Sequence, residues 1–204
     1  MRRGGIVGIA GVPATGKKTV GSLLAEELGC RHSTVLELAS ESGRIISYDE
    51  SMAEHVVDVR SLRRALMSPP SDLCVLSGVL VPHVLPRRSA SLVVVLRASP
   101  EVLYPRYVER GYPPEKARDN LLAEALGVAL DEALRAYGPR LVHEVDATSR
   151  DPRSIAEEVL EVLRGSRPRA LLMMDWLDVC ERVERLRRIC FPELFGHQGA
   201  RRRS

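Results

Sequence analysis

Lysine and side-chain amides are scarce in this chain. Lysine occurs only at positions 17, 18 and 116, although Lys and Arg together number 30, so nearly all of the positive charge is arginine. Asn120 and Gln198 are the only side-chain amides among the 204 residues. Few amides, many arginines and 13 prolines favour a thermophilic source, and a biased genome base composition would give the same pattern.

Other features are missing altogether, and each absence excludes a class of protein. No apolar run approaches the roughly 20 residues that cross a bilayer, so we expect no membrane-spanning segment. An apolar run follows Met1-Arg2-Arg3 almost at once, which leaves no room for a signal peptide. The five histidines form no spaced set, and the four cysteines have no metal-ligand spacing. We therefore expect no histidine metal ligand and a cytoplasmic protein with reduced thiols, Cys74 lying in a core strand.

The composition as a whole fits a folded domain with an added C-terminal segment. A chain of 204 residues can bury a substantial core, and 45% hydrophobic with 28% charged residues is typical of globular rather than disordered proteins. The formal net charge of +3 does not by itself indicate a nucleic-acid-binding protein.

The most informative motif lies between an apolar run at 6–10 and a helix-like segment at 20–28. It reads Gly11-Val12-Pro13-Ala14-Thr15-Gly16-Lys17-Lys18-Thr19. Two glycines separated by four residues, with a lysine directly after the second, form a phosphate-binding P-loop when a strand precedes them and a helix follows. Backbone N–H groups at the helix start donate to phosphate oxygens, and Lys17 would reach the β- and γ-phosphates. The hydroxyl residue that normally follows the lysine and helps to hold Mg²⁺ is replaced by Lys18, so Thr19 comes one residue late.

Apolar runs alternate with helical patterns along the chain. We expect buried strands at 6–10, 73–76, 92–96 and 141–145, and helices at 59–67, 100–110, 114–137 and 152–164. This alternation predicts an α/β fold with a parallel sheet covered by helices on both faces. Only about four residues separate the helices at 100–110 and 114–137, which leaves no room for a long lid. Residues 165–168 read as a linker, followed by one amphipathic helix at 170–190 and a basic end at 201–203.

Arginines at two places could bind a phosphorylated ligand. Arg106 and Arg110 lie four residues apart on one helix face, so they could clamp phosphates or form a solvated basic face. Arg150 follows the last expected strand, at the edge of the sheet where ligands bind. It could stack on a base there, or pair with Asp146 or Asp151.

Several blocks stand in the order found in one known family. They are the P-loop, Tyr48-Asp49-Glu50, Val94-Val95-Leu96-Arg97, Val102-Leu103-Tyr104-x-Arg106, Glu109-Arg110-Gly111-Tyr112 and Asp119-Asn120. Over roughly residues 5–164 the chain resembles the adenylate kinase isoenzyme 6 family, known in yeast as Fap seven, which has many archaeal members. The Arg-Gly-Tyr block is fairly specific to that family, whereas the P-loop alone is not.

The resemblance implies a small P-loop nucleoside-monophosphate-kinase-like fold, with three layers and a short lid. It implies transfer of a phosphoryl group from ATP to AMP or another nucleoside monophosphate, together with a slow ATPase. It also implies a role in small ribosomal subunit maturation and rRNA processing through the platform ribosomal protein S-eleven, with ribosomal RNA contacted indirectly. A kinase-like domain would span residues 1–164, and a helical extension with a basic tail would span 165–204.

Site residues follow from the same resemblance. ATP is assigned to Ala14, Gly16, Lys17, Lys18, Thr19, Arg110 and Arg150, with Mg²⁺ beside Thr19. The monophosphate is assigned to residues 34–57, where Thr34 and Glu37 offer a hydroxyl and an acid, and where Arg44 could replace an arginine that is absent at Ser40. An ordinary surface helix and loop is the alternative for that segment. Residues 109–119 would be the lid, and Lys17, Arg106 and Arg110 would neutralise charge during the transfer.

Three positions near the expected metal depart from the family pattern. Lys18 replaces a hydroxyl, while Ser77 and Val79 stand where an aspartate and a histidine are usual. His83 could replace that histidine only if the chain bulges at Pro82. Losing both contacts to the metal's water shell would cost several kcal/mol of transition-state stabilisation, or about 10²-fold in rate.

Three functions follow as hypotheses. The first is a nucleoside-monophosphate kinase that converts ATP and AMP into two ADP. The second is a nucleotide-gated ribosome assembly factor with little or no kinase activity, and the third is a P-loop kinase for another small substrate. The extension either packs back on the domain or docks a protein partner, with its arginine tail on RNA phosphates.

Overall fold

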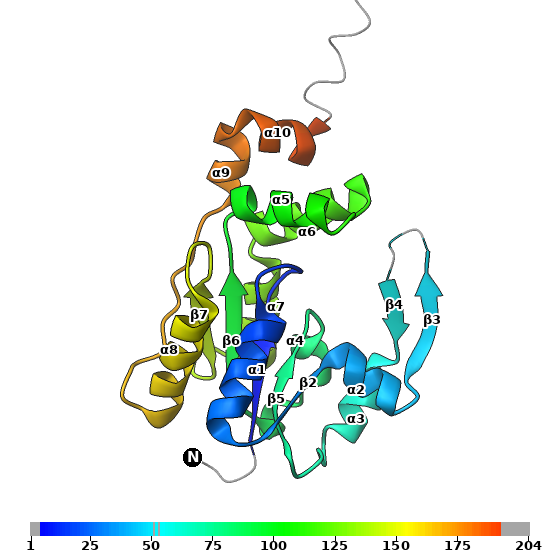
Figure 1. Ribbon diagram of the computed structural model, residues 1–204, viewed down its shortest axis with the longest axis vertical. Coiled ribbons are helices and arrows are strands. Elements are labelled where there is room, and N and C mark those ends of the chain that lie inside the picture. Colours follow the sequence, from blue (N-terminus) through cyan, green and yellow to red (C-terminus); the bar gives the residue numbers. More distant parts are fainter. Residues whose placement is uncertain (1–4, 51, 53, 193–204) are drawn as a thin grey trace, which may run out of the picture.

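The computed structural model describes residues 5–50, 52 and 54–192, which form a three-layer α/β fold (Figure 1). Five parallel strands make the central sheet in the order β2-β5-β1-β6-β7. They are β1 (Ile6–Ala10), β2 (Arg31–Thr34), β5 (Leu73–Ser77), β6 (Ala90–Arg97) and β7 (Val142–Asp146). The four strands expected from apolar runs correspond to β1, β5, β6 and β7, so the predicted parallel sheet is confirmed.

Helices cover both faces of the sheet, as the alternating pattern predicts. One face packs against α1 (Lys17–Leu28) and α8 (Pro152–Arg164). The other face packs against α2 (Val35–Glu41), α3 (Val59–Ala65), α4 (Val81–Val84) and α7 (Val128–Tyr137), and a short 3-10 helix, η1 (Arg87–Ser89), leads into β6. β6 has no polar alternation because its side chains contact both helical layers. None of the helices in the described part of the chain is long and apolar enough to span a bilayer.

Three strands, the edge strand β2 and the two strands of a hairpin, are not predicted from the sequence. β2 lies at the edge of the sheet and reads Arg31-His32-Ser33-Thr34. β3 (Ile45–Asp49) and β4 (Glu54–Val57) pair with each other as an antiparallel hairpin, separate from the central sheet and mostly exposed. The hairpin therefore makes up much of the segment expected to bind a monophosphate.

The helix expected at 114–137 is wrong as a single element. The structure has α6 (Pro114–Ala125) and α7, which are interrupted where Gly127 adopts φ 68°. This left-handed conformation strains residues other than glycine, and it lets the chain turn close to the Arg97 guanidinium. α5 (Pro100–Glu109) is joined to α6 by residues 110–113 alone, which confirms that no long lid is inserted there.

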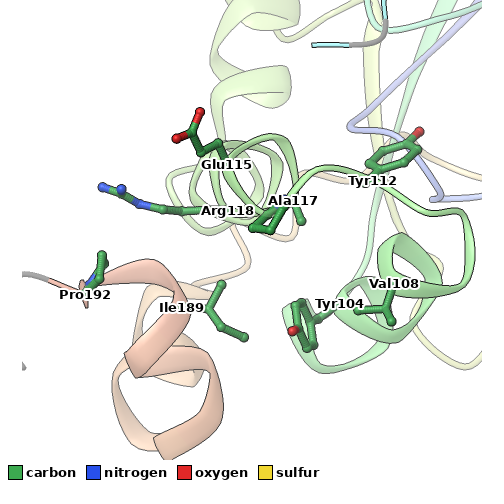
Figure 2. Close-up of a pocket in the computed structure, with 9 residues that line it drawn as sticks. Tyr104, Val108, Tyr112, Glu115, Ala117, Arg118, Ile189 and Pro192 are labelled. Atoms are coloured by element: carbon green, nitrogen blue, oxygen red, sulfur yellow. The ribbon is translucent and has the colours of Figure 1, made fainter. Parts of the chain in front are cut away.

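The C-terminal extension also differs from the single helix expected at 170–190. Residues 168–176 are not helical, and two short helices follow, α9 (Leu177–Arg182) and α10 (Glu184–Cys190). Both helices pack on α5 and α6. This agrees with the first of the two alternatives for the extension, that it packs back on the domain. Figure 2 shows Ile189 of α10 facing Tyr104 of α5 and Ala117 of α6 across a pocket of about 310 Å³. The basic end at 201–203 lies outside the described residues.

The expectation of four reduced thiols is wrong for two cysteines. Cys30 and Cys74 form a disulfide, with Cα atoms 6.0 Å apart. Cys74 lies in β5 as expected, and the turn after α1 brings Cys30 beside that strand. A separation of 44 residues gave no sign of this pairing. Cys180 and Cys190 are buried free thiols whose Sγ atoms lie 3.7 Å apart.

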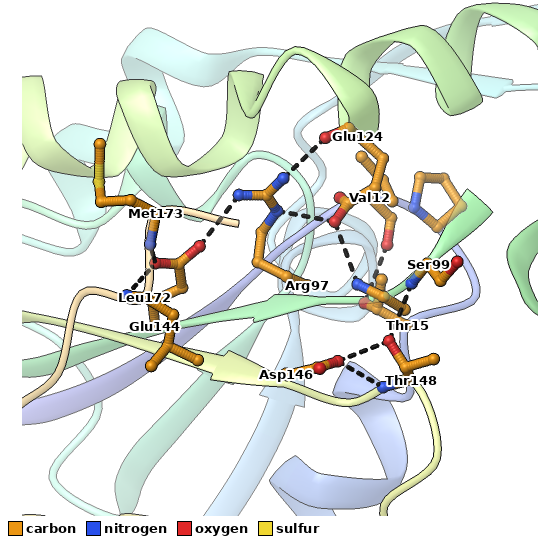
Figure 3. Close-up of polar contacts among 12 residues, drawn as sticks. Val12, Thr15, Arg97, Ser99, Glu124, Glu144, Asp146, Thr148, Leu172 and Met173 are labelled. Atoms are coloured by element: carbon orange, nitrogen blue, oxygen red, sulfur yellow. Dashed lines mark hydrogen bonds and ion pairs between the residues drawn. The ribbon is translucent and has the colours of Figure 1, made fainter. Parts of the chain in front are cut away.

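A buried ion cluster joins several elements under the loop that follows β1 (Figure 3). Arg97, at the end of β6, is 1% exposed; its Nε lies 2.7 Å from Glu124 Oε1 of α6, and its NH1 lies 3.0 Å from Glu144 Oε1 of β7. Glu144 Oε2 in turn accepts hydrogen bonds from the backbone N–H groups of Leu172 and Met173, at 2.6 and 2.7 Å. The extension is therefore tied to the sheet through the charge cluster as well as through apolar packing.

Arg97→Met should destabilise the fold strongly, because it leaves two buried carboxylates without their shared cation. We expect a loss of about 3–5 kcal/mol in the free energy of unfolding, measured by urea denaturation. Arg135→Met is the matched control, since it breaks an exposed ion pair with Asp131 on α7 and should change stability little. Similar losses in the two variants would contradict a structural role for the cluster.

Candidate functional site

The chain between β1 and α1 turns around two glycines with left-handed backbone. Gly11 has φ 133°, and a Cβ there would lie 2.3 Å from the carbonyl oxygen of Leu96, so the loop is seated directly on the end of β6. Gly16 has φ 94° and is the N-cap of α1. Between them Ala14 has φ 64°, which strains a residue with a Cβ by about 1–2 kcal/mol. The geometry places the N–H groups of the first turn of α1 at the carboxyl edge of the sheet, where they can bind an anion.

Two side chains of helix α5 support this loop by donating hydrogen bonds to carbonyl oxygens of the loop backbone. Arg106 NH1 donates to the carbonyl oxygen of Ala14 at 2.8 Å, and the Tyr107 hydroxyl donates to that of Pro13 at 3.1 Å. Arg106 was expected to neutralise transferring phosphates, and here its guanidinium is engaged with the loop backbone. α5 therefore fixes the shape of the loop.

Lys17 lies folded onto the same loop. Its Nζ donates to the carbonyl oxygen of Val12 at 2.6 Å, and that oxygen also accepts from Thr15 Oγ1 at 3.0 Å. Burial lowers the pKa of Lys17 to about 7, the Glu124 carboxylate opposes this shift, and the Arg110 guanidinium adds to it. A bound phosphate group would supply the negative charge that favours the ammonium form.

Lys18, Thr34 and Glu37 form a single polar group at the start of α2. Lys18 Nζ lies 2.8 Å from Glu37 Oε1, while Thr34 and Glu37 cap the helix reciprocally through backbone N–H groups, at 2.8 and 3.0 Å. The hydrogen bond from Lys18, with one from the Thr34 backbone, lowers the pKa of Glu37 to about 2. The Glu37 carboxylate is thus committed to the cap and to Lys18.

A cleft of about 670 Å³ opens beside the loop. It is lined by parts of the loop, of α2, of β4, of the end of β5 and of α6: Pro13, Lys17, Lys18, Thr34, Val35, Leu36, Glu54, His55, Val56, Val57, Val59, Ser77, Gly78, Val79, Leu80 and Asn120. Most of the wall is apolar, with a few polar groups, which is the character of a small-molecule site. Of the three residues singled out for a monophosphate, Thr34 lines this cleft. Arg44 instead donates from NH1 to the carbonyl oxygen of Ser42 at 3.0 Å.

A histidine from β2 reaches the end of β5. His32 Nε2 lies 2.8 Å from Ser77 Oγ, and His32 Nδ1 lies 3.2 Å from Ser22 Oγ of α1. Gly21 leaves space for the ring, since a Cβ at that position would come within 2.6 Å of His32 Nε2. Burial lowers the pKa of His32, which favours the neutral ring. The pair Ser77–His32 therefore occupies the position where the family pattern has an acid.

His83 does not replace the histidine missing at Val79. It lies on α4 with Nε2 3.2 Å from Glu132 Oε2 of α7, and neither residue lines the cleft. His83 therefore faces α7. Val79, where the histidine was expected, lines the cleft with an apolar side chain.

The two remaining arginines occupy different surroundings. Arg110 ends α5 as an exposed C-cap and is close enough to Lys17 for its charge to lower the lysine pKa. Arg150 pairs with Glu158 of α8, NH1 to Oε2 2.6 Å, so the expected alternatives Asp146 and Asp151 are wrong as partners. Asp146 accepts instead from the loop after β7, and Asp151 caps α8.

Metal-binding side chains are not clustered here. In the part of the chain that the structure describes, no group of three His, Cys, Asp or Glu side chains is placed to hold an ion. Thr19, the residue expected beside Mg²⁺, is exposed on the first turn of α1. Thr19 and Ser77, the two positions discussed for the metal, each offer a hydroxyl oxygen.

Sequence reasoning missed two contributors to the site. Tyr107 lies between the two recognised blocks that end at Arg106 and begin at Glu109, and nothing in its spacing shows that its hydroxyl supports Pro13. Glu124 is fully buried beside the loop and influences Lys17, and in the sequence it is one of several acids on a helix. Buried acids cannot be told from surface acids without knowing which helix face is covered.

Comparison with known proteins places the chain among nucleotide-binding families. Residues 7–127 match a family model described as an AAA domain. The chain is 36% identical over 178 residues to "Putative adenylate kinase" of Thermococcus kodakarensis, covering 87% of this chain and 96% of the relative. A protein of the same name from Methanothermobacter thermautotrophicus is 38% identical over 159 residues, covering 78% and 90%. The finer resemblance to the isoenzyme 6 family stays a prediction.

Solved structures support the fold. Shikimate kinase from Acinetobacter baumannii in complex with shikimate has a TM-score of 0.54 at 19% identity, covering 81% of this chain and 96% of that one. A gluconokinase from Sinorhizobium meliloti has a TM-score of 0.51 at 21% identity, covering 81% and 95%. At such identities the similarity concerns the fold, which is that of P-loop kinases.

Tyr107→Phe should weaken binding of a non-hydrolysable ATP analogue several-fold, because the Pro13 carbonyl loses its donor and the loop loosens. Tyr137→Phe is the matched control, since that hydroxyl donates to Val81 and Leu85 carbonyls away from the loop. Both variants should lose similar stability, about 1 kcal/mol each. Calorimetric titration compares the affinities; equal affinities in the two variants would remove the assigned role of Tyr107.

Proposed function

Because the chain belongs to the archaeal adenylate-kinase-like family, we propose that it is a nucleoside-monophosphate kinase that transfers the γ-phosphoryl group of ATP to AMP. One observation carries the proposal. Lys17 belongs both to the phosphate-binding loop and to the wall of the adjoining 670 Å³ cleft. A donor on the loop and an acceptor in the cleft would thus bring their phosphates together at one ammonium group.

The donor side is the loop from Gly11 to Thr19. Its backbone N–H groups would bind the phosphates, and Lys17 would exchange the Val12 carbonyl for a phosphate oxygen. Arg110, exposed next to Lys17, would add charge to the transferred group, while Arg106 keeps the loop in shape through Ala14. We place the adenine near Arg150, whose guanidinium is held by Glu158.

The acceptor side is the cleft between α2 and β4. Its apolar wall suits the flat face of a base, and Thr34 and Asn120 offer polar contacts. Lys18 would face the acceptor phosphate from the opposite side, with Glu37 steering its ammonium. Arg44 stays a candidate for that phosphate only if it leaves Ser42.

The residues present fit a metal carried by the nucleotide. Mg²⁺ takes oxygen ligands and often keeps several waters, and the hydroxyls of Thr19 and Ser77 are the groups that would face it. When bound, the ion would supply charge neutralisation on the phosphates. The missing carboxylate at Ser77 predicts slower turnover than a family member with an acid there.

The Ser77–His32 pair also favours a second function. A neutral pair at that position would allow ATP binding with slow hydrolysis and little phosphoryl transfer. The protein would then act in the cytoplasm as a nucleotide-gated factor for small-subunit maturation. Its partner would be the platform ribosomal protein S-eleven, and ribosomal RNA would be contacted indirectly.

Purified protein with ATP, Mg²⁺ and AMP should form ADP at a rate that depends on AMP. Lys17→Ala should reduce this rate by at least about 10²-fold, because the shared ammonium is lost. Coupled ADP detection measures both proteins, and a panel of other monophosphates and small acceptors defines the preferred substrate. If the wild-type protein forms ADP at a rate that does not depend on AMP and does not exceed that of Lys17→Ala, the kinase function is rejected and the assembly factor is favoured.

A further inference from the structure

Lys116 is the one lysine of the sequence outside the P-loop, and it is buried. It lies in the first turn of α6 and is 5% exposed, whereas lysines are mostly exposed in proteins. Its Nζ donates to the carbonyl oxygen of Met52 at 2.7 Å and lies 3.0 Å from Glu54 Oε1. The same ammonium lies over the Tyr112 ring, 4.7 Å from the ring centre. Charge-assisted bonds of this kind are stronger than neutral ones.

These contacts join α6 to the hairpin β3–β4. Figure 1 shows the hairpin standing apart from the central sheet. At its base Ile45 and Val57 pack against the core, and Asp58 N donates to the Arg44 carbonyl at 2.9 Å. A two-stranded hairpin is at best marginally stable by itself. Lys116 contacts the hairpin near its far end, at Met52 and Glu54.

The same hairpin forms one wall of the cleft. Glu54 and the next three residues of β4 line it opposite Lys17, and Asn120 lines it from α6, one helical turn beyond Lys116. α6 and β4 are thus two sides of a single cavity, and Lys116 connects them. The helix that carries Lys116 also follows the α5 segment that supports the P-loop.

We propose that Lys116 is the positioning residue of the acceptor site: it fixes β4 against α6 and so sets the affinity for a nucleoside monophosphate. The proposal rests on the proposed function, because the cleft is taken to hold the acceptor. Lys116 acts through the hairpin backbone at Met52 and through Glu54. Its only route to the P-loop that the described contacts show is indirect, through the Tyr112 ring, which stacks on Tyr107. We therefore expect its loss to change the acceptor affinity much more than the donor affinity.

Lys116→Met tests this, since methionine retains an apolar stem of similar length without the charge. We expect the AMP KM and the AMP dissociation constant to rise about tenfold, while the ATP KM and the kcat at saturating AMP stay within about twofold. Lys116→Arg should recover most of the AMP affinity because it can still donate to Met52. Arg135→Met, which breaks an exposed pair on α7, should leave all four constants unchanged.

Glu54→Gln provides a second, milder variant, because the bond from Lys116 to the Met52 carbonyl remains. It should raise the AMP KM a few-fold. Adding it to Lys116→Met should raise the AMP KM no further, since Lys116→Met has already removed the interaction with Glu54. A rise of the ATP KM equal to that of the AMP KM would overturn the proposal. So would an unchanged AMP KM in Lys116→Met.

Hydrogen exchange tests the role of Lys116 without requiring catalysis, so its result does not depend on whether the protein is a kinase. Amide hydrogen exchange over 45–57 should be faster in Lys116→Met than in the wild-type protein, with exchange in β1 and β6 unchanged. If the wild-type protein makes no ADP, the kinase assignment fails and the exchange result still reports on the contact. Equal exchange of the hairpin in both proteins would show that Lys116 does not position it.

Discussion

The buried Arg97 guanidinium is the interaction on which the site depends. It lies between Glu124 of α6 and Glu144 of β7, and all three side chains are at most 1% exposed. Two carboxylates face one cation, so the cluster carries a surplus negative charge, and burial raises the pKa of Glu124. The nearby Lys17 ammonium opposes that surplus. The sheet, α6 and the phosphate-binding loop therefore form one electrostatic unit.

Helices α5 and α6 connect this unit to both halves of the site. α5 supports the loop through Arg106 and Tyr107, and α6 fixes the hairpin through Lys116. Only four residues, 110–113, join the two helices. The extension packs on both helices, so it restrains the segments that contact the loop and the hairpin.

The parts of the molecule that can be predicted from the sequence are those whose local residue pattern is compatible with only one type of backbone structure. Continuous apolar runs give the buried strands, and glycine spacing before a helix gives the loop. The edge strand β2 and the hairpin are polar and exposed, so no apolar pattern marks them. The partners of Arg150 and Lys116, and the disulfide at Cys30, depend on distant segments that meet only in the fold. Gly127 was visible as a glycine, but an isolated glycine within a helical pattern does not by itself show a break.

In the proposed function, one chain binds a donor on the loop and an acceptor in the adjoining cleft, with their phosphates meeting at Lys17. Calorimetric titration with a compound of two adenosines joined by five phosphates tests it most directly, because that compound spans both sites. We expect one molecule of this compound to bind per chain, after which neither ATP nor AMP binds. Displacement of ATP alone, with AMP binding unaffected, would contradict it.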